Sequence, residues 1–211
     1  MRDLLDWRWS FRLLPPALRE LRVRPCGVLH IGAHHGEEVP VYQECGFESI
    51  TLVEADPECC AIIAGMPWIS DPRVGIVNRA CVAPGGPARA TFHRAESTAF
   101  SGLVRDKRQP EQAAFTVETI TVGDLQLMCD ANVLVVDTQG TEMDVLAGIR
   151  HLPLDLIVVE SQSERRGAPG AYLPDLQEWA HTHGWAIHTR WLRANGWADT
   201  LLIPARMGVP A

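Results

Sequence analysis

Five short apolar runs recur along the chain, separated by segments of helical character. They are nearly continuous in valine, isoleucine and leucine, which is typical of strands buried on both faces of a parallel sheet. The runs are GVLHI (27–31), SITLV (49–53), RVGIV (73–77), NVLVV (132–136) and DLIVV (155–159). This pattern predicts a parallel sheet with helices between its strands.

The segments between the runs carry helix start and stop signals. Asp56 is placed to cap a helix over 56–65, with Pro57 at its first helical position. Thr141, capping toward Asp144, starts a comparable segment over 141–150, and the segment 37–46 ends in glycine. Alternating strands and helices predict right-handed crossovers and a doubly wound α/β sheet.

The last third of the chain continues with a helix near 172–183 and two strand-like runs, GWAIHTRWL (184–192) and ADTLLIP (198–204). The dipeptide Asn195-Gly196 lies between these runs and is a strong hairpin signal. This end of the chain is therefore expected to add antiparallel strands to the sheet.

Residues 84–118 interrupt the alternation with two short strands joined by a polar loop. Loops of this length in a compact domain are usually functional or mobile, so we expect substrate contacts or a lid there. A variable surface loop is the alternative. Residues 25–211 are expected to form one domain that carries this insertion.

Residues 1–24 form an arginine-rich arm. Its arginines break the apolar stretches, leaving neither a signal-peptide core nor the ~20 apolar residues of a membrane span. We expect no stable membrane insertion and a cytoplasmic location. The arm is predicted to be a helix packed on the domain with Leu14, Leu18 and Leu21 inward; a membrane-surface or partner-binding arm is the alternative.

Composition narrows the classes of partner. A formal net charge of −7 argues against nucleic acid, whose binding depends on neutralising phosphates. The 6 cysteines lie in or beside apolar segments without Cys-x-x-Cys spacing, so we expect reduced, mostly buried thiols. The oligomeric state stays open, a homo-oligomer included.

Candidate chemistry first arises in VLHIGAHHGEEV (28–39), where a strand stops at Gly32 and Gly36 follows. Glycines at such a strand-to-helix turn let a ligand approach the backbone. Glu54 closes the next strand, 22 residues after Gly32, where a carboxylate can accept both hydroxyls of a ribose. Dinucleotides and S-adenosylmethionine both use this arrangement.

The glycine pattern favours S-adenosylmethionine. The dinucleotide fingerprint G-x-G-x-x-G is absent, and Glu37 and Glu38 at the helix start would oppose a pyrophosphate. A sulfonium cofactor has a cationic centre and no phosphate. An NAD-dependent oxidoreductase and a non-catalytic cofactor-binding protein stay open as alternatives.

Acidic residues also follow later strands. Asp137 stands at a strand end before Gly140 and Glu142, and Glu160 follows the run 155–159. In open α/β sheets ligands bind outside the carboxyl ends of the strands, so Gly32, Glu54, Asp137 and Glu160 are expected to converge there. Structural capping is the alternative explanation for these acids.

The two adjacent histidines, His34 and His35, are harder to interpret. They cannot both project the same way from a regular element, and nothing like H-E-x-x-H accompanies them, so we expect no metal site. One of them is a candidate for a catalytic or substrate contact, and an incidental loop role is the alternative. We assign the chemistry of this stretch to the glycines.

Several blocks resemble the FkbM-type family of S-adenosylmethionine-dependent methyltransferases. The opening 30–58 resembles that family's strand, glycine loop, helix and strand, and NRACV (78–82), VETITVGDL (117–125) and VVDTQGTEMDVLAG (135–148) follow in the same order. The resemblance covers roughly 27–161. It implies a seven-stranded methyltransferase sheet with its last strand antiparallel, and O-methylation of a hydroxyl on a sugar or natural-product small molecule.

The resulting hypothesis assigns roles to individual residues. The predicted cofactor-binding residues are Gly32, Ala33, His34, Gly36, Glu54, Ala55, Asn78, Ala80 and Asp137. Asp137 is the first candidate for orienting or deprotonating the acceptor hydroxyl, Glu142 is less well placed, and His34 or His35 is the rival base. Because a sulfonium needs no Lewis acid, we expect methyl transfer to need no metal.

Overall fold

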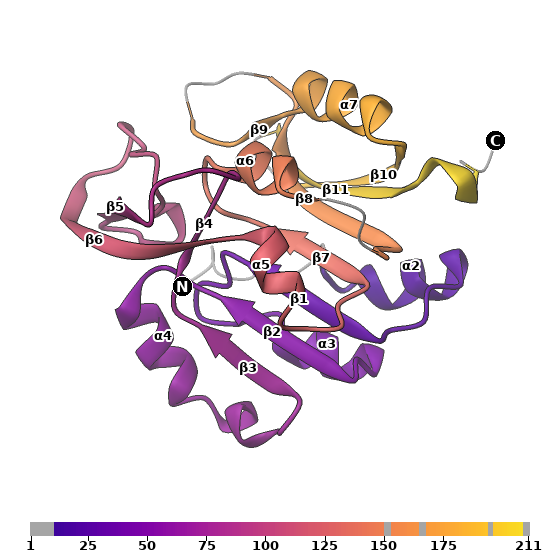
Figure 1. Ribbon diagram of the computed structural model, residues 1–211, viewed down its shortest axis with the longest axis horizontal. Coiled ribbons are helices and arrows are strands. Elements are labelled where there is room, and N and C mark those ends of the chain that lie inside the picture. Colours follow the sequence, from indigo (N-terminus) through magenta and orange to yellow (C-terminus); the bar gives the residue numbers. More distant parts are fainter. Residues whose placement is uncertain (1–10, 150–152, 165–167, 194–195, 209–211) are drawn as a thin grey trace.

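The computed structural model describes residues 11–149, 153–164, 168–193 and 196–208. Its main sheet has the order β10-β11-β8-β7-β1-β2-β3, with the short strand β9 beside β8 (Figure 1). The strands are β1 (Gly27–Ile31), β2 (Ser49–Val53), β3 (Val74–Val77), β7 (Val133–Val136), β8 (Leu156–Gln162), β9 (Ala171–Tyr172), β10 (Trp185–Leu192) and β11 (Trp197–Pro204). β11 runs antiparallel to both of its neighbours, whereas β1, β2, β3, β7 and β8 pair in parallel. The predicted mostly parallel seven-stranded sheet with an antiparallel final strand is confirmed.

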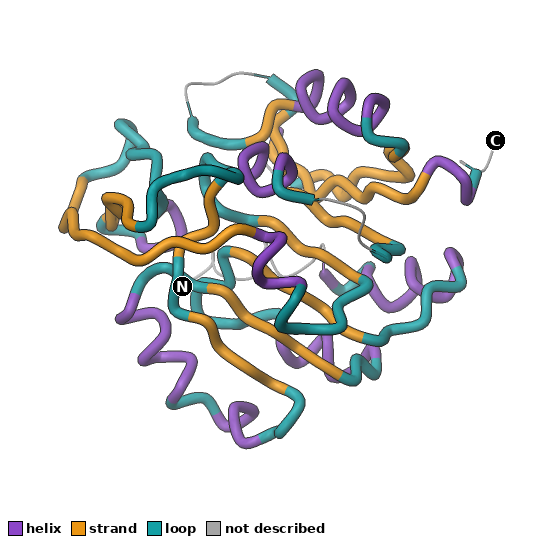
Figure 2. The backbone as a smooth tube through the Cα atoms, viewed as in Figure 1, coloured by secondary structure: helices purple, strands orange, loops and turns teal. Residues whose placement is uncertain are grey.

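Helices cover both faces of this sheet (Figure 2). They are α2 (Leu14–Leu21), α3 (Val39–Cys45), α4 (Pro57–Ala64), α5 (Val122–Gln126), α6 (Glu142–Ala147) and α7 (Leu173–Thr182). Successive strand residues point to opposite faces, so Val28 joins a core with α2 and α3 while Leu29 joins a core with α5, α6 and α7. Burial on both faces explains why these strands are apolar without alternation.

The helix starts differ in how well the sequence foretold them. Asp56 is the N-cap of α4 as predicted: its carboxylate accepts the Glu58 N–H at 2.9 Å, and Pro57 is the first helical residue. Thr141 is the N-cap residue of α6 as predicted, but its side chain makes no capping hydrogen bond toward Asp144. Glu142 instead accepts the N–H groups of the turn before α6.

At the C-terminal end, α7 matches the predicted helix over 172–183, and β10 and β11 form the predicted antiparallel pair. The pair folds back so that β11 lies between β8 and β10. Residues 194–195 of the predicted Asn195-Gly196 turn, and residues 150–152 at the end of the predicted helix over 141–150, lie outside the described residues.

The stretch 84–118 contains β5 (Arg89–Ala95) and most of β6 (Glu111–Thr121), which pair antiparallel. β6 also pairs in parallel with β4 (Ala80–Val82), so the three strands form a second sheet with its own small core around Phe92 and Val117. This sheet lies beyond the end of the main sheet to which the parallel strands point (Figure 1). The polar loop between β5 and β6 includes a 3-10 turn at Thr98–Phe100.

The N-terminal helix α2 packs on the main sheet. Leu14 and Leu18 are buried and Leu21 is half-buried against the same core. Residues 1–10 of the predicted arm lie outside the described residues. No helix among the described residues is long and apolar enough to cross a membrane. The 6 cysteines are free thiols, and Cys59 and Cys81 are buried.

Candidate active site

A cleft of about 620 Å³ opens at the carboxyl ends of β1, β2 and β7. The loop between β5 and β6 forms its opposite wall, so the inserted stretch reaches the predicted site. The lining residues include His30, Gly32, Ala33, His34, Glu37, Glu38, Glu54, Ala55, Cys59, Arg79, Ala80, Phe92, Thr98, Phe100, Leu103, Asp137, Gln139, Glu160, Arg193 and Trp197. The predicted convergence of Gly32, Glu54, Asp137 and Glu160 is therefore present in the fold.

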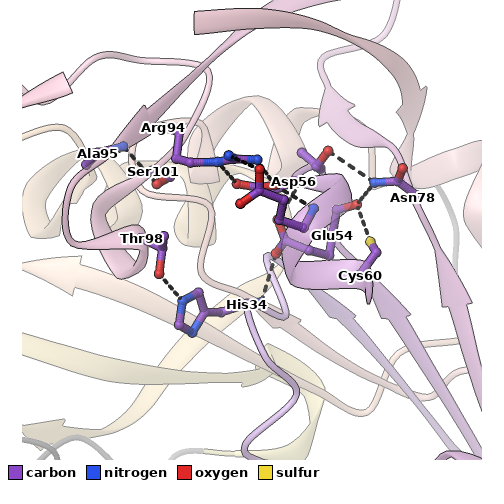
Figure 3. Close-up of polar contacts among 11 residues, drawn as sticks. His34, Glu54, Asp56, Cys60, Asn78, Arg94, Ala95, Thr98 and Ser101 are labelled. Atoms are coloured by element: carbon purple, nitrogen blue, oxygen red, sulfur yellow. Dashed lines mark hydrogen bonds and ion pairs between the residues drawn. The ribbon is translucent and has the colours of Figure 1, made fainter. Parts of the chain in front are cut away.

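Glu54 is fixed by the main chain on both sides. One carboxylate oxygen accepts the His34 N–H at 2.8 Å and the other accepts the Asp56 N–H at 2.7 Å (Figure 3). Burial raises the pKa of Glu54 to about 7, although the two N–H donors favour its ionised form. Each oxygen keeps a lone pair for a donor in the cleft.

The glycines of the opening loop serve the fold more than they leave space for a ligand. A Cβ on Gly32 would lie 1.8 Å from the carbonyl oxygen of Asp137, and one on Gly36 would lie 2.7 Å from the Trp68 ring. Both glycines also have positive φ, 84° and 70°. Gly32 lines the cleft, but close packing of β1 against β7 is what requires a glycine there.

His34 is part of the site rather than an incidental loop residue. Its φ of 48° is unusual for a residue other than glycine, and its ring joins two segments. Nδ1 lies 3.0 Å from a Glu37 oxygen. Nε2 lies 2.9 Å from the Thr98 hydroxyl (Figure 3). Burial opposes a charge on the ring, but Glu37 and the neighbouring acids Glu54 and Asp137 outweigh it and raise the pKa of His34.

A buried ion pair ties the inserted sheet to the side of the cleft that carries Glu54. Arg94 on β5 donates from Nε and Nη2 to the two carboxylate oxygens of Asp56, at 2.6 and 2.5 Å (Figure 3). Its Nη1 lies 2.5 Å from a Glu58 oxygen, and its guanidinium lies over the Phe115 ring at 4.9 Å. Bidentate geometry and burial make this the main polar link between the insertion and α4.

The other side of the cleft is a network of side chains. Gln139 Nε2 donates to Asp137 at 2.6 Å and to Glu160 at 2.7 Å, bridging the two carboxylates. Arg193 donates to Glu160 at 2.7 Å and also contacts Asp199. Burial, with the charge of Asp137, raises the pKa of Glu160 well above its usual range despite Arg193. Glu160 lies within β8 rather than after it, because that strand runs on to 162.

Between the two sides lies a buried floor made by His30, Glu38 and Tyr42. The Tyr42 hydroxyl is 3.1 Å from His30 Nδ1, and a Glu38 oxygen is 3.9 Å from the same nitrogen. Burial lowers the pKa of His30 to about 4 and raises that of Glu38 to about 8. The floor therefore favours an uncharged imidazole and a protonated carboxyl.

Four of the predicted site residues do not line the cleft: His35, Gly36, Asn78 and Glu142. Asn78 donates to the carbonyl oxygens of Glu54 and Ala55, so it supports the acid from behind. Glu142 is buried and accepts the N–H groups of Thr138 and Gly140, both at 3.0 Å. It shapes the turn after Asp137 and does not face an acceptor.

Sequence reasoning missed Arg193, Gln139 and Thr98, which all line the cleft. Arg193 follows an edge strand and Thr98 lies in a polar loop, so neither carries a local pattern. Gln139 carried a weak signal, because it sits between an acid at a strand end and a glycine at a helix start.

Comparisons with models of known protein families and with curated protein sequences found no match. Solved structures do share the fold. Among them, the FkbM methyltransferase from Methylobacillus flagellatus aligns with a TM-score of 0.57 and 14% identity, over 85% of this chain and 43% of that chain. The precorrin-6y C5,15-methyltransferase from Geobacter metallireducens aligns at 0.55 and 12%, over 96% and 90%. TrmK of M. capricolum, solved with S-adenosylhomocysteine, aligns at 0.51 and 10%, over 92% and 68%.

The chain thus has the class I S-adenosylmethionine-dependent methyltransferase fold. Identities this low identify the fold alone, and the FkbM structure is one of several similar neighbours. Membership of the FkbM-type family stays a prediction.

Proposed function

We propose that this protein is an S-adenosylmethionine-dependent methyltransferase that methylates a hydroxyl group of a sugar or natural-product small molecule. The observation that carries the proposal is Glu54, whose carboxylate is held by two main-chain N–H groups at the end of β2 and lines the cleft. A carboxylate fixed in this way accepts a pair of vicinal hydroxyls without having to reorganise.

The residues present suit the cofactor. Glu54 would hold the ribose, and the small residues Ala55 and Ala80 leave room beside it for the adenine. Glu37 and Glu38 also line the cleft next to the glycine loop. The carboxylate of Glu37 favours a cationic sulfonium over a pyrophosphate, which supports S-adenosylmethionine over NAD. When bound, the cofactor supplies an activated methyl group.

The protein's task would then be to place the acceptor. Asp137 lines the cleft at the end of β7, beside the Gly32 turn, and Gln139 fixes one of its oxygens. Its other oxygen is the candidate to orient the acceptor hydroxyl or to accept its proton. His34 is the rival base because it also faces the cleft, whereas His35 does not line it.

Calorimetry with S-adenosylhomocysteine and with NAD tests the cofactor assignment. We expect binding of the former in the micromolar range and none of the latter. Binding of NAD alone would overturn the assignment in favour of an oxidoreductase.

Transfer of a labelled methyl group from S-adenosylmethionine to a panel of hydroxylated acceptors tests the reaction. Asp137→Asn should lower turnover while S-adenosylhomocysteine still binds. A folded Asp137→Asn protein with normal turnover would leave the base to His34 or to none. Cofactor binding without transfer to any acceptor class would instead support a non-catalytic binding protein.

A further inference from the structure

Three potential metal ligands meet beside the cofactor side of the cleft. A ring nitrogen of His34, a ring nitrogen of His35 and Sγ of Cys59 all lie within 4.8 Å of one another. Cys59 lies in α4, 24 residues after His35, so no local spacing motif in the sequence links it to the histidines. The expectation of no metal site rested on the histidines having no partner, and the fold supplies one.

Glu37 contacts the imidazole ring of His34 and lies near that of His35. Its Oε1 lies 3.0 Å from Nδ1 of His34 and 3.7 Å from Nδ1 of His35, and the two rings are stacked with centroids 3.7 Å apart. Histidines that ligate metals usually donate their second ring N–H to a carboxylate, which fixes the tautomer. Glu37 is placed to do this for His34 and lies close to the same nitrogen of His35. Nε2 of His35 is available to a metal, and Nε2 of His34 becomes available when it leaves the Thr98 hydroxyl.

The second observation is an unpaired nitrogen. His35 Nε2 is buried and has no hydrogen-bond partner within the described part of the chain. Because buried polar atoms are nearly always paired, such an atom calls for a bound ion or water. Cys59 is buried as well, yet both Cys59 and His34 line the cleft, which provides an entry path for an ion.

The donor set selects the ion. One thiolate and two imidazoles suit Zn²⁺, which binds sulfur at about 2.3 Å and nitrogen at about 2.0–2.1 Å in tetrahedral geometry. Those bond lengths place ligand atoms roughly 3.4–3.6 Å apart. Because the ligand atoms all lie within 4.8 Å of one another, the side chains would have to close in by at most about 1.4 Å, and water would take the fourth position.

We propose that His34, His35 and Cys59 bind a Zn²⁺ ion, with Glu37 orienting the two histidines. As the zinc–sulfur bond forms, the Cys59 thiol loses its proton to solvent. Coordination through His34 Nε2 would replace its hydrogen bond to Thr98, so the ion would also affect the loop between β5 and β6. The ion would organise the loop after β1 and take no part in methyl transfer. A zinc-bound His34 Nε2 could not accept a proton, so an occupied site would leave Asp137 as the candidate base.

The test is titration of metal-free protein with Co²⁺ and then Zn²⁺, without cofactor or acceptor. Wild type should show a thiolate-to-cobalt charge-transfer band and tetrahedral d–d bands, and Zn²⁺ should displace them. Cys59→Ser should lose the charge-transfer band. Cys60→Ser is the matched control, because the Cys60 thiol donates to the Glu54 carbonyl and is not in the cluster.

If Cys59→Ser does not fold, the variants His35→Ala and Glu37→Gln test the same site. His35→Ala should abolish the tetrahedral spectrum, and Glu37→Gln should weaken Zn²⁺ binding roughly 10–100-fold, as loss of an orienting carboxylate does elsewhere. A thiolate band that survives in folded Cys59→Ser, or equal Zn²⁺ affinity in wild type and His35→Ala, would overturn the site.

Discussion

The two sides of the cleft hold their carboxylates by different means. On the side that we propose binds the cofactor (the cofactor side), Glu54 is fixed by N–H groups of the main chain, from residues 34 and 56. On the side that we propose binds the acceptor (the acceptor side), Asp137 and Glu160 are held by the side chains of Gln139 and Arg193. Main-chain donors persist whatever their side chains are, whereas a side-chain network changes when any of its members is substituted. This difference supports a shared cofactor on the first side and an acceptor particular to this enzyme on the second, as we propose.

The largest expected effect comes from the link between the insertion and the cofactor side. Arg94→Ala leaves the buried Asp56 carboxylate without its ion-pair partner, which costs about 3–5 kcal/mol in comparable cases. Urea unfolding measures this loss. Arg105→Ala is the control, because Arg105 is exposed and lies 3.3 Å from Glu111. Equal stability of the two variants would mean that the inserted sheet is held by other contacts.

The floor between the two sides should give opposite pH dependences. The pKa of His30 is lowered to about 4 in the folded protein, because the buried ring stays uncharged. The free energy of unfolding is therefore at its full value above about pH 6.5 and falls as pH drops toward about 4. The pKa of Glu38 is raised to about 8, so burying it costs stability as pH rises from about 4.5 to about 8. Each contribution is on the order of a few kcal/mol.

Urea unfolding across this pH range separates the two groups. His30→Phe should remove the loss of stability as pH falls from about 6.5 to about 4. Glu38→Gln should remove the loss of stability as pH rises from about 4.5 to about 8. Profiles that run parallel to wild type in both variants would show that neither group titrates as its burial implies.

Removal of the Glu54 carboxylate should lower the affinity for the cofactor more than the stability of the fold. Glu54→Ala leaves the ribose hydroxyls unpaired and should weaken S-adenosylhomocysteine binding by ~1–3 kcal/mol. Isothermal titration calorimetry measures the change, with exposed Glu44→Gln on α3 as the control. Unchanged affinity in folded Glu54→Ala would remove this residue from the cofactor site.

The smallest expected effect comes from the Gln139 amide on the acceptor side. Gln139→Asn shortens the amide that bridges Asp137 and Glu160 but keeps a residue type that tolerates its φ of 55°. Loss of these hydrogen bonds, at ~1 kcal/mol, should lower kcat/KM for the acceptor about 5-fold and leave cofactor affinity unchanged. Exposed Gln177→Asn on α7 is the control. A fall in cofactor affinity would contradict the division into two sides.

The sequence by itself determined the sheet and the cofactor side of the cleft. β1, β7 and β8 are buried on both faces, so their apolar runs marked them without any tertiary information. Asp56 and Pro57 marked the start of α4 for a similar reason, because a helix cap is satisfied within a few residues. Glu54 could be found because it follows a strand at a fixed distance from a glycine turn.

Tertiary structure alone decided the rest. It placed β11 between β8 and β10, brought Arg193 to Glu160 and Arg94 to Asp56, and set Cys59 beside the two histidines. It also gave Gly32 and Gly36 a packing role that the motif did not reveal. These contacts join residues that are remote in sequence, and they depend on the direction and distance of side chains. Periodicity and capping signals depend only on residues that are close in sequence, so they cannot predict such contacts.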